Sequence, residues 1–211
     1  MARDAREDCP EVALAVVDSS LTHRLTHPLH IRRATPADAL RLSILAAHVF
    51  VDTYATDGIR ESIAREVEEL LSRDAFDRHV VDAATTILLA EANEHLVGYI
   101  HVARDQPHAA IDARAPVEVV RLYVQPRFAA QRIGTALLEQ VEEQEAGAGA
   151  DVAWLTAWSG NRRALGFYQR RGYVDTGPVV YSFQGEEFEN RLFAKRLDAS
   201  GIPRRLTPAT K

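Results

Sequence analysis

Residues 117–141 constrain the fold of this chain most, because they read as a strand, a loop and a helix in direct succession. The stretch 117–124 is mostly β-branched or aromatic, which favours a buried strand, and Pro126 cannot continue that strand because it lacks an N–H. From Ile133 apolar residues recur at helical spacing, which predicts an amphipathic helix that begins close to Gly134. The loop therefore ends at a helix N-terminus, which favours a phosphate or pyrophosphate. A strand-loop-helix crossover that binds no ligand would show the same sequence pattern.

A second strand and helix follow. Residues 152–158 are apolar and aromatic, which favours another buried strand. The stretch 161–171 reads as a helix, because Asn161 is a good N-cap and arginines occupy the last turn. Gly172 suits the left-handed position just past the helix end. Taken alone, these features predict a helix and nothing more.

Together the two segments resemble the acetyl-CoA-binding motifs of the GCN5-related N-acetyltransferase (GNAT) superfamily. The first motif of that family is Gln or Arg, two residues, Gly, one residue, then Gly or Ala, after a strand that ends in a Tyr-Val-x-Pro-like sequence. In this chain Leu122, Tyr123 and Val124 with Pro126 form the strand end. Gly134 takes the place of the last small residue.

Two positions of this first motif depart from the family pattern. Ala129 stands at the Gln or Arg position and Arg132 at the first glycine, while Gln131 supplies a glutamine two places later. Glycine matters there because a Cβ crowds a backbone that must approach a pyrophosphate closely. We therefore expect binding to depend on the backbone N–H groups from about Gln131 to Thr135, with Arg132 as a cationic supplement.

The second motif is matched at every position. The family pattern is Asn, two residues, Ala, two residues, Phe-Tyr, three residues, Gly, then Phe or Tyr. Matches at fixed spacing in both segments are much harder to obtain by chance than either segment alone. The matching residues are Asn161, Ala164, Phe167, Tyr168, Gly172 and Tyr173.

The resemblance covers residues 29–197 and implies an α/β (α+β) GNAT fold. Such a fold has a central mixed, mostly antiparallel sheet of about seven strands flanked by about four helices. Its fourth strand, here 117–124, and its fifth, here 152–158, splay apart. We expect residues 1–28 to form an N-terminal extension and 198–211 a C-terminal tail.

The other elements are expected from local patterns. Thr35, Pro36 and Asp38 should open a helix that runs to about residue 50. Asp57 should cap a helical region that breaks near 72–74. The expected helices are 35–50, 59–82, 133–146 and 161–171, and the remaining strands are 29–33, a hairpin of 86–91 with 96–104, and a hairpin of 179–183 with 188–197 that turns at 184–186.

Composition excludes several classes of function. The net charge is −5 and no aromatic-laced basic patch occurs, so nucleic acid is not an expected partner. No run of 18 apolar residues exists, so no membrane span is expected. The N-terminus lacks an apolar region of signal-peptide form. The single cysteine, Cys9, cannot form an internal disulfide, which agrees with a cytoplasmic protein.

The resemblance implies that acetyl-CoA is the acyl donor and lies between the splayed strands. Its pantetheine arm would pair with the backbone of residues 122–124 like an added strand, since a splayed pair leaves N–H and C=O groups unpaired. Asn161 and Tyr168 would contact CoA from the second motif. The implied cofactor-binding residues are Leu122, Tyr123, Val124, Ala129, Ala130, Gln131, Arg132, Ile133, Gly134, Thr135, Asn161 and Tyr168.

The implied chemistry is direct transfer of the acetyl group to an amine. The departing thiolate benefits from a proton donor, and Tyr168 stands where the family places its tyrosine, although a core aromatic would fit there too. The amine must lose a proton, and Glu118 is the candidate base because E-x-x-R-L-Y-V resembles a subgroup with a carboxylate there. An exposed glutamate at the strand end is the alternative. His101 is the second candidate.

The acceptor is expected to be a small amine. The stretch 50–54 resembles the corresponding part of polyamine-type members, where it borders the acceptor pocket, and Asp52 with Glu61 could attract a cation. A terminal or lysine amine of a peptide is the alternative substrate. A non-catalytic acyl-CoA sensor or interaction module is the alternative function, because of the departures at Ala129 and Arg132.

The expected partners are acetyl-CoA and an amine acceptor, with a homodimer left open. No metal is expected. His23, His27 and His30 are spaced four and three apart, yet no carboxylate or cysteine partner accompanies them.

Overall fold

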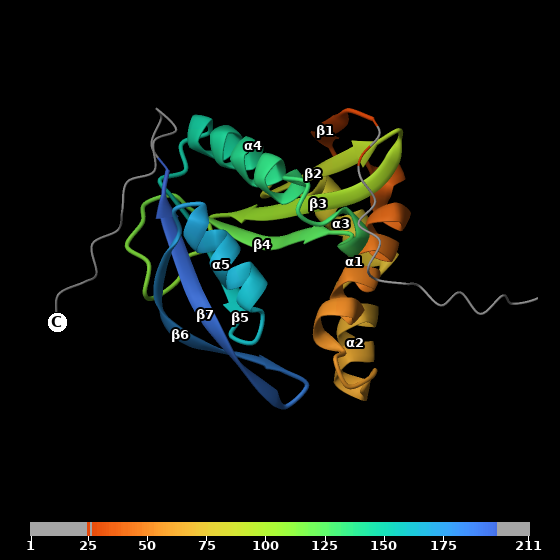
Figure 1. The fold of residues 1–211 in the computed structure, drawn as a ribbon. Coiled ribbons are helices and arrows are strands. Elements are labelled where there is room, and N and C mark those ends of the chain that lie inside the picture. The colour runs from red at the N-terminus through yellow and green to blue at the C-terminus, as the bar shows by residue number, and fades with distance from the viewer. Residues whose placement is uncertain (1–24, 26, 198–211) are drawn as a thin grey trace, which may run out of the picture.

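The computed structural model describes residue 25 and residues 27–197. They form a seven-stranded sheet in the order β1-β2-β3-β4-β5-β7-β6 (Figure 1). Neighbouring strands are antiparallel except for β4 and β5, which are parallel, so the expected mixed, mostly antiparallel sheet is confirmed. The strands are β1 (Leu29–Arg33), β2 (Thr85–Ala92), β3 (His95–Arg104), β4 (Pro116–Val124), β5 (Val152–Trp158), β6 (Val174–Phe183) and β7 (Glu186–Arg196).

Helices cover both faces of this sheet (Figure 1). On one face the apolar sides of α4 and α5 join residues such as Ile100 and Val102 in one core cluster. On the other face α1 and α3 pack with Leu89 and Tyr99 in a second cluster. The helices are α1 (Ala39–Tyr54), α2 (Glu61–Leu70), α3 (Arg73–Val81), α4 (Ile133–Gly147) and α5 (Arg162–Arg170), with short 3-10 helices at Pro36–Asp38 and Pro126–Phe128.

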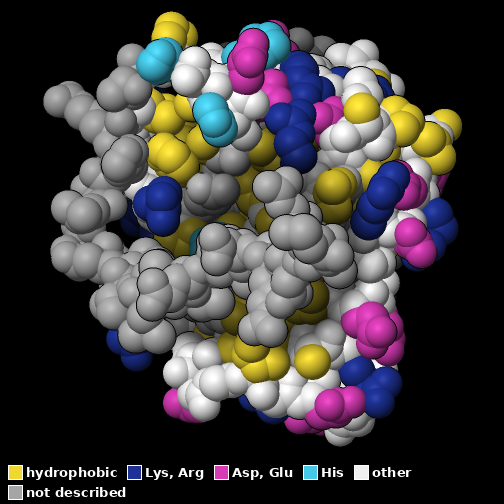
Figure 2. Space-filling model, turned by 90° about the vertical axis from the view of Figure 1, so that its right-hand side faces the viewer, with side chains coloured by type: hydrophobic (Ala, Val, Ile, Leu, Met, Phe, Trp, Pro, Cys, Tyr) yellow, Lys and Arg dark blue, Asp and Glu magenta, His cyan; other side chains and the backbone are white. Residues whose placement is uncertain are grey.

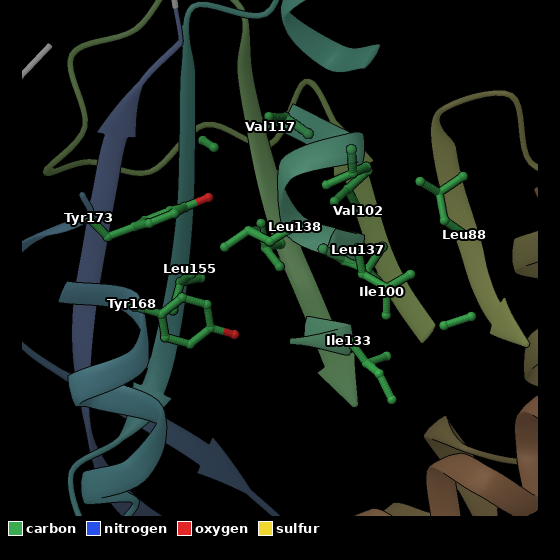
Figure 3. Close-up of a cluster of buried hydrophobic side chains, with 14 of the residues drawn as sticks. Leu88, Ile100, Val102, Val117, Ile133, Leu137, Leu138, Leu155, Tyr168 and Tyr173 are labelled. Carbon is green, nitrogen blue, oxygen red and sulfur yellow. The ribbon is translucent and has the colours of Figure 1, made fainter. Parts of the chain in front are cut away.

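Strands β4 and β5 separate soon after they meet. Their ladder contains only Pro116 with Val152, Val117 with Ala153 and Glu118 with Trp154. Beyond this point β4 keeps its partner β3 and β5 keeps its partner β7. Among the described residues the facing edges of β4 and β5 therefore have no strand partner, and Figure 3 shows the two strands diverging. The expected splay is confirmed.

Local capping explains where the first and third helices begin. Thr35 and Asp38 form a capping box, and Pro36 occupies the first helical position, as expected. The helical region after residue 59 breaks into α2 and α3, because the Ser72 hydroxyl accepts a hydrogen bond from the Ala75 N–H (3.2 Å) and starts a new helix. The predicted break near 72–74 is thus confirmed.

Three predicted boundaries were wrong. Asp57 does not cap α2, because Gly58 adopts a positive φ (109°) and the helix begins only at Glu61, after Arg60. Helix α1 continues to Tyr54 instead of ending near residue 50. Strand β6 begins at Val174 instead of 179, because its ladder with β7 continues across an irregularity between Asp175 and Gly177.

The termini and the surface complete the description. Most of the expected extension 1–28, including Cys9 and His23, and all of the tail 198–211 lie outside the described residues. No helix within the described part is long and apolar enough to cross a membrane. On the face shown in Figure 2, basic and acidic side chains lie interspersed, beside several hydrophobic ones.

Candidate functional site

A cleft of about 700 Å³ opens where β4 and β5 diverge. This volume lies in the range of small-molecule and cofactor sites. The cleft reaches from the end of α1, across β4 and the loop that follows it, to the start of α5. Its lining includes eleven of the twelve residues expected to bind the cofactor: Leu122, Tyr123, Val124, Ala129, Ala130, Arg132, Ile133, Gly134, Thr135, Asn161 and Tyr168.

The floor of the cleft is the end of β4. Leu122 and Val124 pack against the cluster under α4 and α5, whereas Tyr123 packs against the cluster under α1. This alternation follows from the two-residue repeat of a strand. The strand edge that faces β5 is open here, so its N–H and C=O groups are free to pair with the amides of a pantetheine arm.

The loop between β4 and α4 adopts a glycine-like backbone at two residues that are not glycine. Ala130 and Arg132 have φ angles of 62° and 63°, in the left-handed region that side chains rarely adopt. Arg132 is the N-cap of α4, and Ile133 is 1% exposed and anchors the helix start in the core. The first N–H groups of α4 have no intrahelical partner and suit an anion.

Gly134 leaves limited room at this helix start. A Cβ at this position would lie 3.7 Å from Phe167, 3.8 Å from Val124 and 3.9 Å from Leu122. These are ordinary van der Waals distances, so one methyl group fits, but a larger side chain must enter the cleft. The loop and the helix start thus fit the pyrophosphate of CoA.

Helix α5 brings Asn161 and Tyr168 to the cleft. The Asn161 side chain accepts a hydrogen bond from the Ala164 N–H (3.0 Å), which caps the helix. The Tyr168 ring is 8% exposed and packs against Tyr173 and Phe193, with centroids 5.6 and 6.2 Å away. Its hydroxyl points into the gap between β5 and β4 (Figure 3). Burial raises the pKa of Tyr168, so the hydroxyl stays protonated and can donate.

Cationic side chains surround the cofactor end of the cleft. Arg163 and Arg170 of α5 line it together with Arg132 and with Arg171, which follows the helix. Arg171 also contacts Glu139 of α4 (3.5 Å), which joins the two helices that cover this face. Such a collection of guanidinium groups suits the phosphates of CoA.

The opposite end of the cleft is formed by α1 and the end of β5. Asp52, Thr53 and Tyr54 line it, and the ring of Tyr54 lies 5.9 Å from that of Trp158. Asp52 is exposed at this end. Arg121 of β4 lines the same cleft.

Four residues considered from the sequence lie outside the lining. Gln131 instead accepts a hydrogen bond from the Leu25 N–H (2.6 Å). Glu61 is exposed and pairs with Arg65 (2.9 Å). The other two are Glu118 and His101.

Glu118 and His101 differ in their suitability as a base. Glu118 is half-buried at the last β4–β5 pair, where the strands begin to diverge. Burial raises the pKa of Glu118, and the positive charge of Arg121 partly offsets this rise. His101 is 2% exposed beneath His79, and burial lowers its pKa to about 3. Because of that position, His101 is shielded from an acceptor.

Sequence reasoning missed Arg121, Trp158 and Arg163. Arg121 carried a usable signal, because an arginine inside an apolar strand needs either a partner or a ligand. Trp158 carried none, because its contact with Tyr54 joins two segments that are far apart in the sequence.

Comparisons with known proteins match this geometry. The model of the acetyltransferase (GNAT) family matches residues 52–173. An uncharacterized N-acetyltransferase of Lactobacillus delbrueckii is 24% identical over 154 residues, which cover 72% of this chain and 88% of that relative. An aminoalkylphosphonate N-acetyltransferase of Salmonella typhimurium is 32% identical over 117 residues, 54% of this chain and 73% of that relative.

A solved structure shares the fold. The PaiA N-acetyltransferase of Thermoplasma acidophilum, in complex with coenzyme A, superposes with a TM-score of 0.62 and 23% identity, over 78% of this chain and 98% of that one. The described residues hold no group of three His, Cys, Asp or Glu side chains placed to bind a metal ion. Because the family model spans more than half of the chain, the protein belongs to the acetyltransferase (GNAT) family and is an acetyl-CoA-dependent N-acetyltransferase.

Proposed function

We propose that the protein transfers the acetyl group of acetyl-CoA directly to the primary amine of a small molecule. The observation that carries this proposal is the Tyr168 hydroxyl, which points into the gap between β4 and β5 (Figure 3). The same cleft continues to Asp52 and Tyr54, so a donor and an acceptor can meet within it. Direct transfer needs no covalent intermediate on the protein.

The transfer moves two protons. The neutral amine attacks the thioester carbonyl, the new C–N bond forms and the C–S bond breaks, so the sulfur leaves as CoA thiolate. Tyr168 is placed to donate a proton to this thiolate, and burial keeps its hydroxyl protonated at neutral pH. The proton of the amine passes to a base.

Glu118 is the proposed base. It lies on β4 four residues before the predicted pantetheine contact at Leu122, at the point where the strands diverge. Because Glu118 is outside the cleft lining, the proton reaches it through a water molecule. A carboxylate with a raised pKa is a better proton acceptor near neutral pH than an ordinary one.

The acceptor class follows from the size of the cleft and from the relatives. A cleft of about 700 Å³ that also receives the thioester leaves room for a short amine. A polyamine, attracted by Asp52, is the acceptor expected from the sequence. The name of the Salmonella relative adds the aminoalkylphosphonates, which are short primary amines with an acidic group.

A thiol-release screen tests the proposal. The protein is mixed with acetyl-CoA and with polyamines, amino acids, aminoalkylphosphonates, aminoglycosides or short peptides, and free CoA is measured. We expect CoA release with at least one small amine, and mass spectrometry should find its N-acetyl derivative. Release with peptides alone would contradict the small-molecule proposal.

The non-catalytic alternative predicts a different result. The motif loop holds Ala130 and Arg132 at positive φ, where the family motif favours glycine at the second of these positions. A sensor would bind acetyl-CoA in calorimetry and release no CoA with any amine of the panel. A homodimer and a cytoplasmic location remain predictions, which light scattering and cell fractionation can check.

A further inference from the structure

Arg121 is a half-buried cation without a partner in the cleft. It lies in β4, lines the cleft, and makes no hydrogen bond or salt bridge within the part of the chain that the structure describes. Two other half-buried arginines of this protein are paired: Arg104 with Glu145 (2.6 Å) and Arg191 with Asp175 (2.9 Å). A guanidinium that is partly removed from water and unpaired is costly unless an anion comes to it.

The direction of Arg121 places it on the acceptor side. Leu122 and Val124 pack toward α4 and α5, so the alternation of β4 directs Arg121, like Tyr123, toward the face that carries α1. Burial raises the pKa of Glu66 on α2 and of Tyr54 on α1, and the positive charge of Arg121 counteracts this rise. This electrostatic influence agrees with a side chain that points toward α1. Arg121 therefore lies at the acceptor end of the cleft.

The two carboxylates whose charge Arg121 influences, Glu66 and Glu118, form no salt bridge with it among the described residues. Glu66 accepts a hydrogen bond from the Tyr181 hydroxyl (3.0 Å), at the place where the β6–β7 hairpin meets α2 (Figure 1). Glu118 lies on the same strand, yet no oxygen of either carboxylate is within 4.0 Å of the Arg121 guanidinium among the described residues. The fork of N–H donors on Arg121 is thus available to a ligand.

We propose that the acceptor is a short amine that also carries an acidic group, and that Arg121 binds this group. A carboxylate or phosphonate matches the planar fork of a guanidinium and can accept two hydrogen bonds from it. Arg121 directly precedes the predicted pantetheine contact at Leu122–Val124, so the acidic group and the reacting nitrogen lie only a few bonds apart. A polycation, in contrast, would be repelled by Arg121. This inference rests on the proposed function and narrows its substrate class.

Matched acceptors and variants test the inference. The acidic acceptors are β-alanine and aminoethylphosphonate, and ethanolamine and putrescine are the neutral and cationic controls. We expect the wild-type protein to favour the acidic acceptors in kcat/KM by about 100-fold, the typical effect of a charge-assisted bidentate contact. Arg121→Gln should remove this preference, mainly through KM, and Arg121→Lys should retain part of it. Arg114→Gln, at a side chain that is 96% exposed, should leave the preference unchanged.

Two further readouts keep the inference separate from the proposed function. Circular dichroism must show that Arg121→Gln is folded. If it is not, Arg121→Lys takes its place in the comparison of acceptors. If no amine is acetylated, the proposed function fails, and calorimetry of β-alanine with the CoA-bound protein still decides the inference. Equal use of acidic and neutral amines, or β-alanine binding that Arg121→Gln does not weaken, would overturn it.

Discussion

At the scale of single residues, the proposed acetyl transfer depends most on Tyr168. Replacing Tyr168 by Phe removes the proton donor while the ring still packs against Tyr173 and Phe193. We expect kcat to fall by about 100-fold or more, the usual contribution of a positioned general acid. Because the ring and its packing remain, the KM for acetyl-CoA should change little.

Tyr173→Phe is the matched control for this variant. Tyr173 is 3% exposed and belongs to the same core cluster, but it does not line the cleft. Loss of the Tyr173 hydroxyl should leave kcat within about twofold of the wild-type value. Similar kcat values for the two variants, measured by CoA release, would show that Tyr168 is only a core residue.

Glu118 is tested by the pH dependence of the rate. A base must be ionised, so kcat/KM falls as the pH drops through the pKa of Glu118, and burial moves this fall above the ordinary range of a carboxyl group. In Glu118→Gln the rate should drop by about 100-fold and the fall at low pH should disappear. A variant that keeps the wild-type profile would assign the base to another group.

The sequence was informative about residues of the motifs and silent about residues that only the fold brings together. Asn161 and Tyr168 could be placed, because they lie two turns apart on a capped helix and both line the cleft. Gln131 was misplaced relative to the cleft, since the left-handed residues on either side of it redirect the loop. Arg121 was visible in the sequence as a charge in a strand, yet its lack of a partner is a fact of the fold.

At the scale of elements, the start of α4 should be sensitive to bulk. Gly134→Leu must push a side chain into the cleft, because its Cβ already contacts Phe167, Val124 and Leu122. We expect the Kd for acetyl-CoA to rise by more than about tenfold, while Gly134→Ala has a small effect. Arg132→Ala removes one exposed cation, which is worth about 1 kcal/mol at most.

The control for this series lies at the other end of the same helix. A side chain at Gly147 meets nothing within 4 Å, so Gly147→Leu changes bulk without entering the cleft. Calorimetry of acetyl-CoA should rank Gly134→Leu as the weakest binder. A larger loss in Arg132→Ala would contradict the view that backbone N–H groups hold the pyrophosphate.

Elements were predicted best where capping chemistry is local. The box at Thr35 and Asp38 and the break before α3 could be read from the sequence because each depends on neighbours a few residues away. The starts of α2 and β6 could not be predicted from the sequence. They are set by a positive φ at Gly58 and by pairing of β6 with β7 across an irregular ladder, and neither has a periodic signal.

At the scale of the whole molecule, a buried charge network joins β1, β2 and α1. Asp38 is 2% exposed and accepts two hydrogen bonds from Arg32 (both 2.8 Å) and one from Arg41, while Arg32 and Arg41 also bind Glu91. The Arg32 guanidinium holds the pKa of Asp38 well below its usual range. This network fixes the edge of the sheet against the helix whose other end borders the cleft.

The stability of this network should depend on pH. Because the folded pKa of Asp38 is depressed, its contribution is complete above the pKa of the unfolded chain and is lost as the pH falls toward the folded value. Asp38→Asn should therefore lower the free energy of unfolding by about 3 kcal/mol at neutral pH, and by less below pH of about 4. Urea melts at both pH values check this, with the exposed Asp112→Asn as control. A loss that stays constant with pH would contradict the ionic role.

The topology as a whole was expected from the two motifs, since each motif follows one of the two strands that flank the splay. Direct acetyl transfer within that splay is tested most directly with acetyl-CoA labelled in its acetyl group. After incubation with protein and a short acidic amine, mass spectrometry should find the label on the amine nitrogen, in amounts equal to the CoA released, with none on the protein. Label bound to the protein chain, or acetyl-CoA that binds without any transfer, would contradict the account.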